Sequence, residues 1–159
     1  MSKAPSTNAT RLLRQAGVAF TEHLYRYEEH GGTRVSAEAL GVAEHAVIKT
    51  LVMEDERGVP LIILMHGDRE VSTKELARQI GAKSVQPCKP DMANRHSGYL
   101  VGGTSPLGTR KPMPIHAEAT IFDLPGIYLN GGSRGFLVGL DPRELELVLK
   151  VNRVSVAIS

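Results

Sequence analysis

The sequence predicts an α/β fold of the mixed α+β kind, in which about seven strands form a partly closed β-barrel flanked by helices. First, a chain of 159 residues is long enough for one well-cored domain and short for two. Second, stretches with helical and with strand periodicity are interleaved, without strict strand–helix–strand alternation. Third, the chain contains no repeat, linker or low-complexity segment. We therefore expect a flexible N-terminal arm at 1–7 and a single domain at 8–159.

In the N-terminal half, the elements follow from hydrophobic spacing and from glycines that end helices. Apolar residues three and four positions apart favour a helix at 8–17, and apolar–polar alternation favours a strand at 18–25. Gly41 and Gly81 follow short helical stretches, as C-cap glycines do, and Ser72 begins the second stretch as a capping residue. The expected elements are helices 8–17, 36–40 and 72–80, a loop at 26–34, and strands 18–25, 47–53 and 59–65.

Shorter elements are expected in the C-terminal half, where prolines and glycines interrupt the pattern. Pro90 suits the first position of a helix that ends near His96. Asp141, followed by proline, favours the start of a helix that runs to about Lys150. The expected strands are 84–86, 113–116, 119–122, 127–129, 136–139 and 152–157.

Composition excludes several classes of protein. A formal net charge of +2 is too small for a polycation, so RNA binding would require the basic residues to gather on one face. A single cysteine, Cys88, excludes an internal disulfide framework and fits a reducing compartment. The N-terminus has no apolar signal core, and no apolar stretch is long enough to span a bilayer. We therefore expect a cytoplasmic protein with no membrane association.

Two glycine-rich segments are candidate ligand-binding loops. The first, Gly98–Gly108 (GYLVGGTSPLG), contains Gly102 and Gly103 and a bend at Ser105-Pro106. Glycine lets the backbone approach a ligand closely, and consecutive amides can form an anion-binding nest. The second segment, Asn130–Gly135 (NGGSRG), has the same character. The alternative is that both are tight connections without a ligand, because glycine-rich turns are common.

Three side chains admit both a functional and a structural interpretation. Lys49 lies within the apolar run 47–53, and lysine is rarely buried without a partner. Taken alone, it is expected to reach solvent at a strand edge; otherwise its ammonium lines a pocket, where it would bind a phosphate or polarise a carbonyl. Arg134 could pair with a phosphate or with an internal carboxylate, and Tyr25 could face a pocket or pack at a strand end.

The signatures of common catalytic chemistries are missing. The six histidines have no paired metal-ligand spacing, and the chain has no G-x-S-x-G, P-loop or dinucleotide motif. Cys88 has no C-x-x-C partner, although the adjacent Lys89 could lower its thiol pKa. Three Phe, four Tyr and no Trp argue against an aromatic platform for single-stranded nucleic acid. We expect neither a metal nor a cofactor.

Val47-Ile-Lys-Thr-Leu51 and the two glycine-rich segments, in this order and spacing, resemble the YbaK family. These proteins are free-standing aminoacyl-tRNA deacylases related to the editing insertion of bacterial prolyl-tRNA synthetases. The resemblance runs from the first helix to the last strand. It implies an enzyme with a mixed barrel fold, and it points to the branch that clears cysteine from tRNA(Pro).

The resemblance also implies a site. Lys49 would be the catalytic residue, near the aminoacyl ester and the terminal adenosine. No protein nucleophile is implied: the substrate's own thiol attacks its ester and releases a thiolactone, while the site positions the substrate and stabilises the oxyanion. The implied partners are the aminoacyl-tRNA acceptor end and, transiently, prolyl-tRNA synthetase. The implied substrate-binding residues are Tyr25, Thr50, Gly102, Gly103, Thr104, Ser105, Pro106, Asn130, Gly131, Gly132 and Arg134.

Two positions depart from the cysteine-clearing pattern. Asn130 stands where these relatives often have serine, and Leu137 stands where they often have a polar residue. Another small amino acid on tRNA(Pro), such as alanine, therefore stays open as the substrate. A second class of function also stays open, namely a non-catalytic module that binds tRNA ends or a nucleotide.

Overall fold

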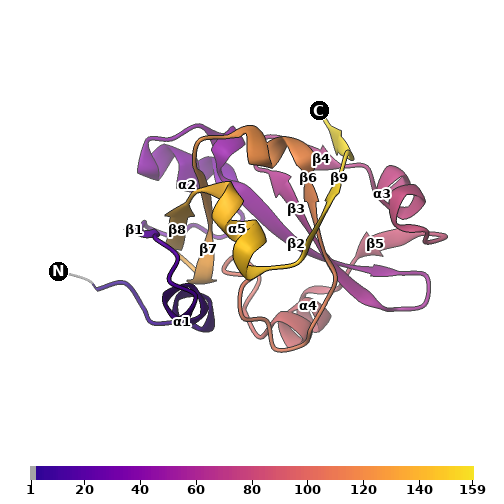
Figure 1. Cartoon of the computed structure of the whole chain (residues 1–159), viewed down its shortest axis with the longest axis horizontal. Helices are drawn as coiled ribbons and strands as arrows, with labels where there is room; N and C mark the ends of the chain where they lie inside the picture. The colour runs from indigo at the N-terminus through magenta and orange to yellow at the C-terminus, as the bar shows by residue number, and fades with distance from the viewer. Residues whose placement is uncertain (1–2) are drawn as a thin grey trace.

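Strands β2 (Ile48–Asp55) and β3 (Pro60–His66) form the central antiparallel hairpin of the computed structural model, which describes residues 3–159 (Figure 1). β5 (Val85–Pro87) extends this sheet beyond β2. On the other side β6 (Ile115–Glu118) and β9 (Val151–Val154) add in parallel, which gives the order β5-β2-β3-β6-β9. Every residue of β3 is buried, as expected for an uninterrupted apolar run.

Two smaller sheets complete the fold. β1 (Thr21–Leu24), β8 (Phe136–Leu140) and β7 (Ile127–Ser133) form an antiparallel sheet in the order β1-β8-β7, and β4 (Glu70–Val71) pairs with β10 (Ala157–Ile158). A single parallel bridge, Val47 to Tyr128, connects the three-stranded sheet to the start of β2. The mixed α/β class is therefore confirmed. The barrel is not: the strands of residues 3–159 form three sheets and no closed barrel.

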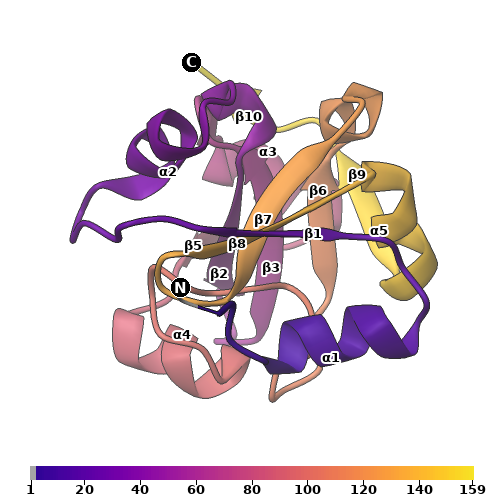
Figure 2. The same cartoon turned by 90° about the vertical axis from the view of Figure 1, so that its left-hand side faces the viewer.

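The helices surround these sheets (Figure 2). α1 and α4 lie at the lower edge of that view, while α2 and α5 lie on opposite sides. Left-handed glycines end three of the helices, at Gly41, Gly81 and Gly98. The helices are α1 (Asn8–Gln15), α2 (Gly32–Leu40), α3 (Thr73–Ile80), α4 (Pro90–Ser97) and α5 (Pro142–Val148), with 3₁₀ turns at η1 (Glu44–Ala46) and η2 (Ala119–Asp123).

Three sequence expectations were wrong. Residues 119–122 form the 3₁₀ turn η2 instead of a strand, because a four-residue apolar run does not distinguish the two periods. The segment Asn130–Gly135 is not a free loop: β7 continues through Ser133 over a bulge. Helix α2 starts at Gly32, inside the expected loop 26–34.

The N-terminal residues contact the domain. Ala4 packs against the main core, and Thr7 caps α1 by accepting a hydrogen bond from the N–H of Thr10. Residues 1–2 of the expected arm lie outside the described residues. Among the described helices, none combines the length and the apolar composition that crossing a bilayer requires.

Candidate active site

A cavity of about 500 Å³ opens beside β2 and contains Lys49. We call it the lysine pocket. Its walls come from β2, from β4, from the start of α4 and from the first glycine-rich segment. Its lining includes Thr50, Glu70, Cys88, Ala93, Val101, Gly102, Thr104 and Asn130.

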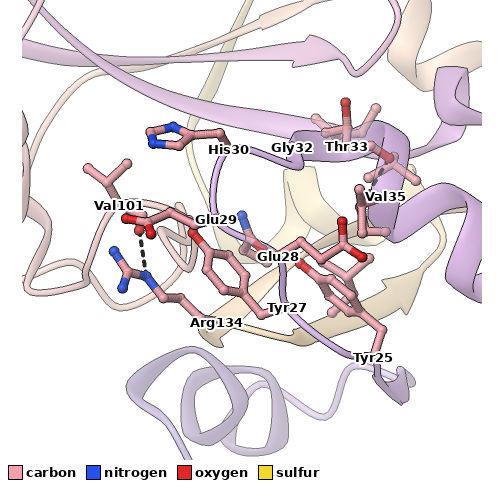
Figure 3. A pocket seen from close by; sticks show the side chains of 16 residues that line it. Tyr25, Tyr27, Glu28, Glu29, His30, Gly32, Thr33, Val35, Val101 and Arg134 are labelled. Carbon is pink, nitrogen blue, oxygen red and sulfur yellow. Dashed lines mark hydrogen bonds between the residues drawn. The ribbon is translucent and has the colours of Figure 1, made fainter.

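A second cavity, of about 280 Å³, adjoins it (Figure 3). We call it the tyrosine pocket, because Tyr25 and Tyr27 line it together with Arg134 and Leu137. Val101, Gly102 and Asn130 line both cavities, so they form the wall between them. The predicted site residues are thus divided between two neighbouring pockets instead of meeting in one.

The Lys49 side chain is mostly buried and has one ionic partner. Its side chain is 20% exposed, and Nζ lies 3.6 Å from a carboxylate oxygen of Glu70, whose own side chain is 74% exposed. Because Glu70 is so exposed, solvent screens this ion pair. Lys49 therefore lines a pocket, and the carboxylate that faces it can be displaced at little cost by an anionic ligand.

Thr50 adds an unpartnered hydroxyl to the same pocket. Its Oγ1 is buried and forms no hydrogen bond with any atom of residues 3–159. A buried polar group without a partner costs about 1–3 kcal/mol. A ligand that supplied a hydrogen bond here would recover part of that cost.

The first glycine-rich segment is held from both sides at Val101. The N–H of Val101 donates to Oδ1 of Asn94 on α4 (3.0 Å), and Nε of Arg134 donates to the Val101 carbonyl (2.9 Å). Gly102 has a φ of +96°, and a Cβ on it would lie 2.5 Å from the Tyr27 hydroxyl. Only glycine fits this position without displacing Tyr27.

The rest of the first segment packs inward. A Cβ on Gly103 would lie 2.8 Å from the backbone of Ser133, so Gly103 brings the two glycine-rich segments together. Ser105 is fully buried and its Oγ accepts from the N–H of Leu107 (3.1 Å). Thr104 lines the lysine pocket, whereas Gly103, Ser105 and Pro106 line neither pocket.

The glycines of the second segment are packing positions. A Cβ on Gly131 would overlap the ring of Phe136, and the Gly131 carbonyl accepts from the Thr7 hydroxyl. Gly132 has a φ of +97°, and a Cβ there would lie 2.7 Å from the Tyr99 ring. Neither glycine lines the two pockets, so in this segment only Asn130 and Arg134 do.

The tyrosine pocket has an aromatic and cationic wall. The Arg134 guanidinium stacks over Tyr27, 5.2 Å from the ring centroid, and forms no ion pair with a carboxylate of residues 3–159. Burial, and secondarily the neighbouring Tyr27, raises the pKa of Tyr25. Tyr25 is therefore a neutral hydrogen-bonding group at physiological pH, and neither residue has the internal carboxylate partner considered for Arg134.

Sequence reasoning missed four residues that line the pockets: Tyr27, Glu70, Cys88 and Val101. Tyr27 could have been found, because it lies two positions from Tyr25, the spacing that places extended-chain side chains on one side. The effect expected of Lys89 on Cys88 was wrong in direction. Burial, with a smaller contribution from Glu54, raises the pKa of the Cys88 thiol. That thiol is therefore protonated at neutral pH and is a poor nucleophile.

No described histidine lines the lysine pocket, and residues 3–159 contain no group of three or more His, Cys, Asp or Glu placed to hold a metal ion. Elsewhere His45 and His66 stack in parallel, 3.7 Å between ring centroids, and His66 bonds to the His45 carbonyl and to Thr120. Burial lowers the pKa of His66. This pair occupies the end of the β2–β3 hairpin and lines neither pocket.

Comparison with known proteins gives a family match. The family model for the aminoacyl-tRNA editing domain matches residues 30–147. EbsC of Enterococcus faecalis, named as a candidate Cys-tRNA(Pro)/Cys-tRNA(Cys) deacylase, is 29% identical over 87% of this chain and 85% of its own. The proline–tRNA ligase of Streptococcus equi is 30% identical over 67% of this chain and only 17% of the ligase.

Solved structures share the fold. A crystal structure described as a candidate trans-editing enzyme for prolyl-tRNA synthetase superposes with a TM-score of 0.83 at 20% identity, covering 98% of this chain and 100% of that one. The crystal structure of a hypothetical protein gives 0.87 at 20% identity, covering 96% and 100%. At such low identity these likenesses describe architecture alone.

Proposed function

The chain belongs to the aminoacyl-tRNA editing domain family, and from this premise we propose that it is a trans-acting aminoacyl-tRNA deacylase that clears Cys-tRNA(Pro). The observation that carries the proposal is the family match over residues 30–147. That range contains Lys49, both glycine-rich segments and most of the residues that line the two pockets. The near full-length similarity to EbsC supports the cysteine substrate.

The two adjoining pockets suit a substrate with two parts. An aminoacyl ester joins an amino acid to a terminal ribose, and the wall of Val101, Gly102 and Asn130 separates two cavities of suitable size. In this proposal Lys49 lies beside the ester, where its positive charge stabilises the developing oxyanion. The backbone of the first glycine-rich segment and Asn130 hold the ester in position.

The proposed reaction uses the substrate's own thiol. The cysteine sulfur attacks the ester carbonyl carbon and a carbon–sulfur bond forms. The bond from that carbon to the ribose oxygen breaks, and the thiol proton passes to the ribose oxygen, so the products are a thiolactone and free tRNA. The pocket supports this route, because its own thiol, Cys88, is held protonated by burial and no described histidine in the pocket could act as a base.

A second specificity has one observation in its favour. Leu137 is almost fully buried, at 2% exposed, and presents an apolar side chain to the tyrosine pocket. An apolar wall suits the methyl group of alanine as well as a thiol. Alanine has no internal nucleophile, so its release from tRNA(Pro) would require water.

The decisive experiment measures deacylation of Cys-tRNA(Pro), Ala-tRNA(Pro) and Pro-tRNA(Pro) by wild type, Lys49→Ala and the control Lys74→Ala. We expect rapid loss of cysteine, reduced about 100-fold or more by Lys49→Ala because an electrostatic stabiliser is removed. Lys74 lies outside both pockets and its replacement should have no effect. Preferential loss of alanine would change the substrate, and no turnover on any of the three would favour a non-catalytic binding module.

We further propose a transient complex with prolyl-tRNA synthetase. Its support is the similarity of this chain to a domain-sized part of proline–tRNA ligases, 15–17% of each ligase. If the complex delivers the substrate, added synthetase should sharpen discrimination between charged tRNAs. Equal discrimination with and without synthetase would remove this part of the proposal.

A further inference from the structure

Four exposed cations gather around helix α4, and we call them the basic rim: Lys89, Arg95, Arg110 and Lys111. Lys89 is the N-cap residue of α4, and Arg95 lies in its last turn. The backbone brings the other two to the same place. The N–H groups of Arg110 and Lys111 donate to the carbonyls of Ser97 (3.0 Å) and His96 (2.9 Å), at the C-terminal end of α4.

The basic rim differs from the other charged surfaces in having no carboxylate partners. None of its four cations forms an ion pair within residues 3–159, and Asp91 is the one carboxylate between residues 89 and 117. Arginines elsewhere do have carboxylate partners: Arg14, Arg34, Arg57, Arg69, Arg78, Arg143 and Arg153. The weak overall charge of +2 therefore hides a local excess of positive charge.

This excess lies on the outer side of the lysine pocket's wall. Pro90 and Ala93 of α4 line that pocket, and the Asn94 side chain holds the N–H of Val101, which lines both pockets. The rim cations point to solvent from the same helix and from the chain directly after the first glycine-rich segment. A ligand that extends out of the pocket over this wall would pass the rim.

We propose that the basic rim binds the backbone phosphates of the acceptor stem of the substrate RNA. This inference rests on the proposed function, because the 3′ end must first occupy the pocket. Lys89 and Arg95 are separated by about 9 Å along α4, a length that covers more than one phosphate of a nucleic-acid strand. Contacts of this kind fix position without reading bases, so the rim provides affinity for the stem without sequence preference.

The test compares two substrates that carry the same amino acid, full-length tRNA(Pro) and the trinucleotide CCA. The test variant is the triple replacement Arg95→Gln, Arg110→Gln and Lys111→Gln. The control, Arg57→Gln, Arg78→Gln and Arg143→Gln, removes the same charge from exposed arginines that have carboxylate partners. We expect the rim variant to lower kcat/KM on tRNA about tenfold and to weaken its salt dependence by about two logarithmic units per decade. Turnover of the trinucleotide should be unchanged, and so should both activities of the control.

Three results would overturn the proposal. An equal loss on both substrates would mean that the rim supports the pocket, and no loss on tRNA would mean that it binds no phosphate. A loss that appears only when prolyl-tRNA synthetase is added would mean that the rim contacts a protein. If wild type cleaves neither substrate, the proposed function fails by itself. Fluorescence anisotropy of uncharged tRNA(Pro) with the same variants then decides the rim independently, with about tenfold weaker binding expected for the rim variant alone.

Discussion

The two glycine-rich segments have similar composition but occupy different structural situations. The first, Gly98–Gly108, runs irregularly from α4 toward β6, and its Gly102 lies in the wall between the two pockets. The second, Asn130–Gly135, is the bulged end of a β-hairpin, and its Gly131 and Gly132 are covered by aromatic rings. Glycine permits close approach in both, but of a ligand in the first and of the protein's own side chains in the second.

The largest expected effect is on the second segment. Gly131→Ala places a methyl group inside the Phe136 ring and should destabilise the fold by about 1–3 kcal/mol, the usual cost of overpacking a core. Urea unfolding measures it. Gly126→Ala is the matched control, because its added Cβ would meet no atom within 4 Å. Equal midpoints for the two variants would show that the hairpin can open, and the distinction between the segments would fail.

Gly102→Ala should act mainly on the site. The new Cβ meets the Tyr27 hydroxyl, the far end of a side chain that can move toward the tyrosine pocket, and a φ of +96° adds backbone strain. We expect deacylation to fall about tenfold or more, since positions near the reacting atoms tolerate little displacement. The unfolding midpoint should drop less than for Gly131→Ala. A larger drop in stability than in activity would place Gly102 with the packing glycines.

Arg134→Gln tests the link between the segments. The replacement removes the hydrogen bond to the Val101 carbonyl and the stacking on Tyr27, a loss of about 1 kcal/mol in total for an exposed side chain. KM should rise because Val101 is held from one side only. Arg143→Gln, on α5, is the control. If both variants keep the wild-type KM, Asn94 alone positions the first segment.

The smallest effect at neutral pH concerns Tyr99, which belongs to the first segment and packs beneath Gly132 of the second. Burial raises its pKa to about 12, from the ordinary 10.0, while its hydroxyl donates to the Leu107 carbonyl (2.6 Å). The unfolded chain therefore loses this proton first as the pH rises. Stability from Tyr99 should be complete below pH 10 and decline between pH 10 and about 12.

Thermal unfolding of wild type and Tyr99→Phe from pH 8 to pH 11.5 measures this decline. The Phe variant should be less stable at pH 8, by roughly the 1 kcal/mol of a lost hydrogen bond, and should show a shallower alkaline decline. Parallel curves would mean that Tyr99 titrates normally and that the two segments are not tightly packed at this point.

Much of the local structure was predictable from short-range rules. Pro90 at the start of α4, Ser72 before α3 and the left-handed glycines at 41 and 81 were identified because caps depend on neighbouring residues alone. The 3₁₀ turn at 119–123 was missed for the opposite reason. Its short apolar run is compatible with either period, and burial of Ile121 and Phe122 in the assembled core decides between them.

The sequence by itself determined the mixed α/β class, the positions of most helices and the motifs that identify the family, since these depend on spacing along the chain. Only the tertiary structure decided how the site residues are divided. It placed Asn130 beside Gly102 and Glu70 beside Lys49, and it covered Gly131 and Gly132 with side chains. It also placed Arg110 and Lys111 at the end of α4. These contacts join residues distant in sequence, and hydrophobic and hydrogen-bonding patterns within one segment carry no information about which distant segment will cover it.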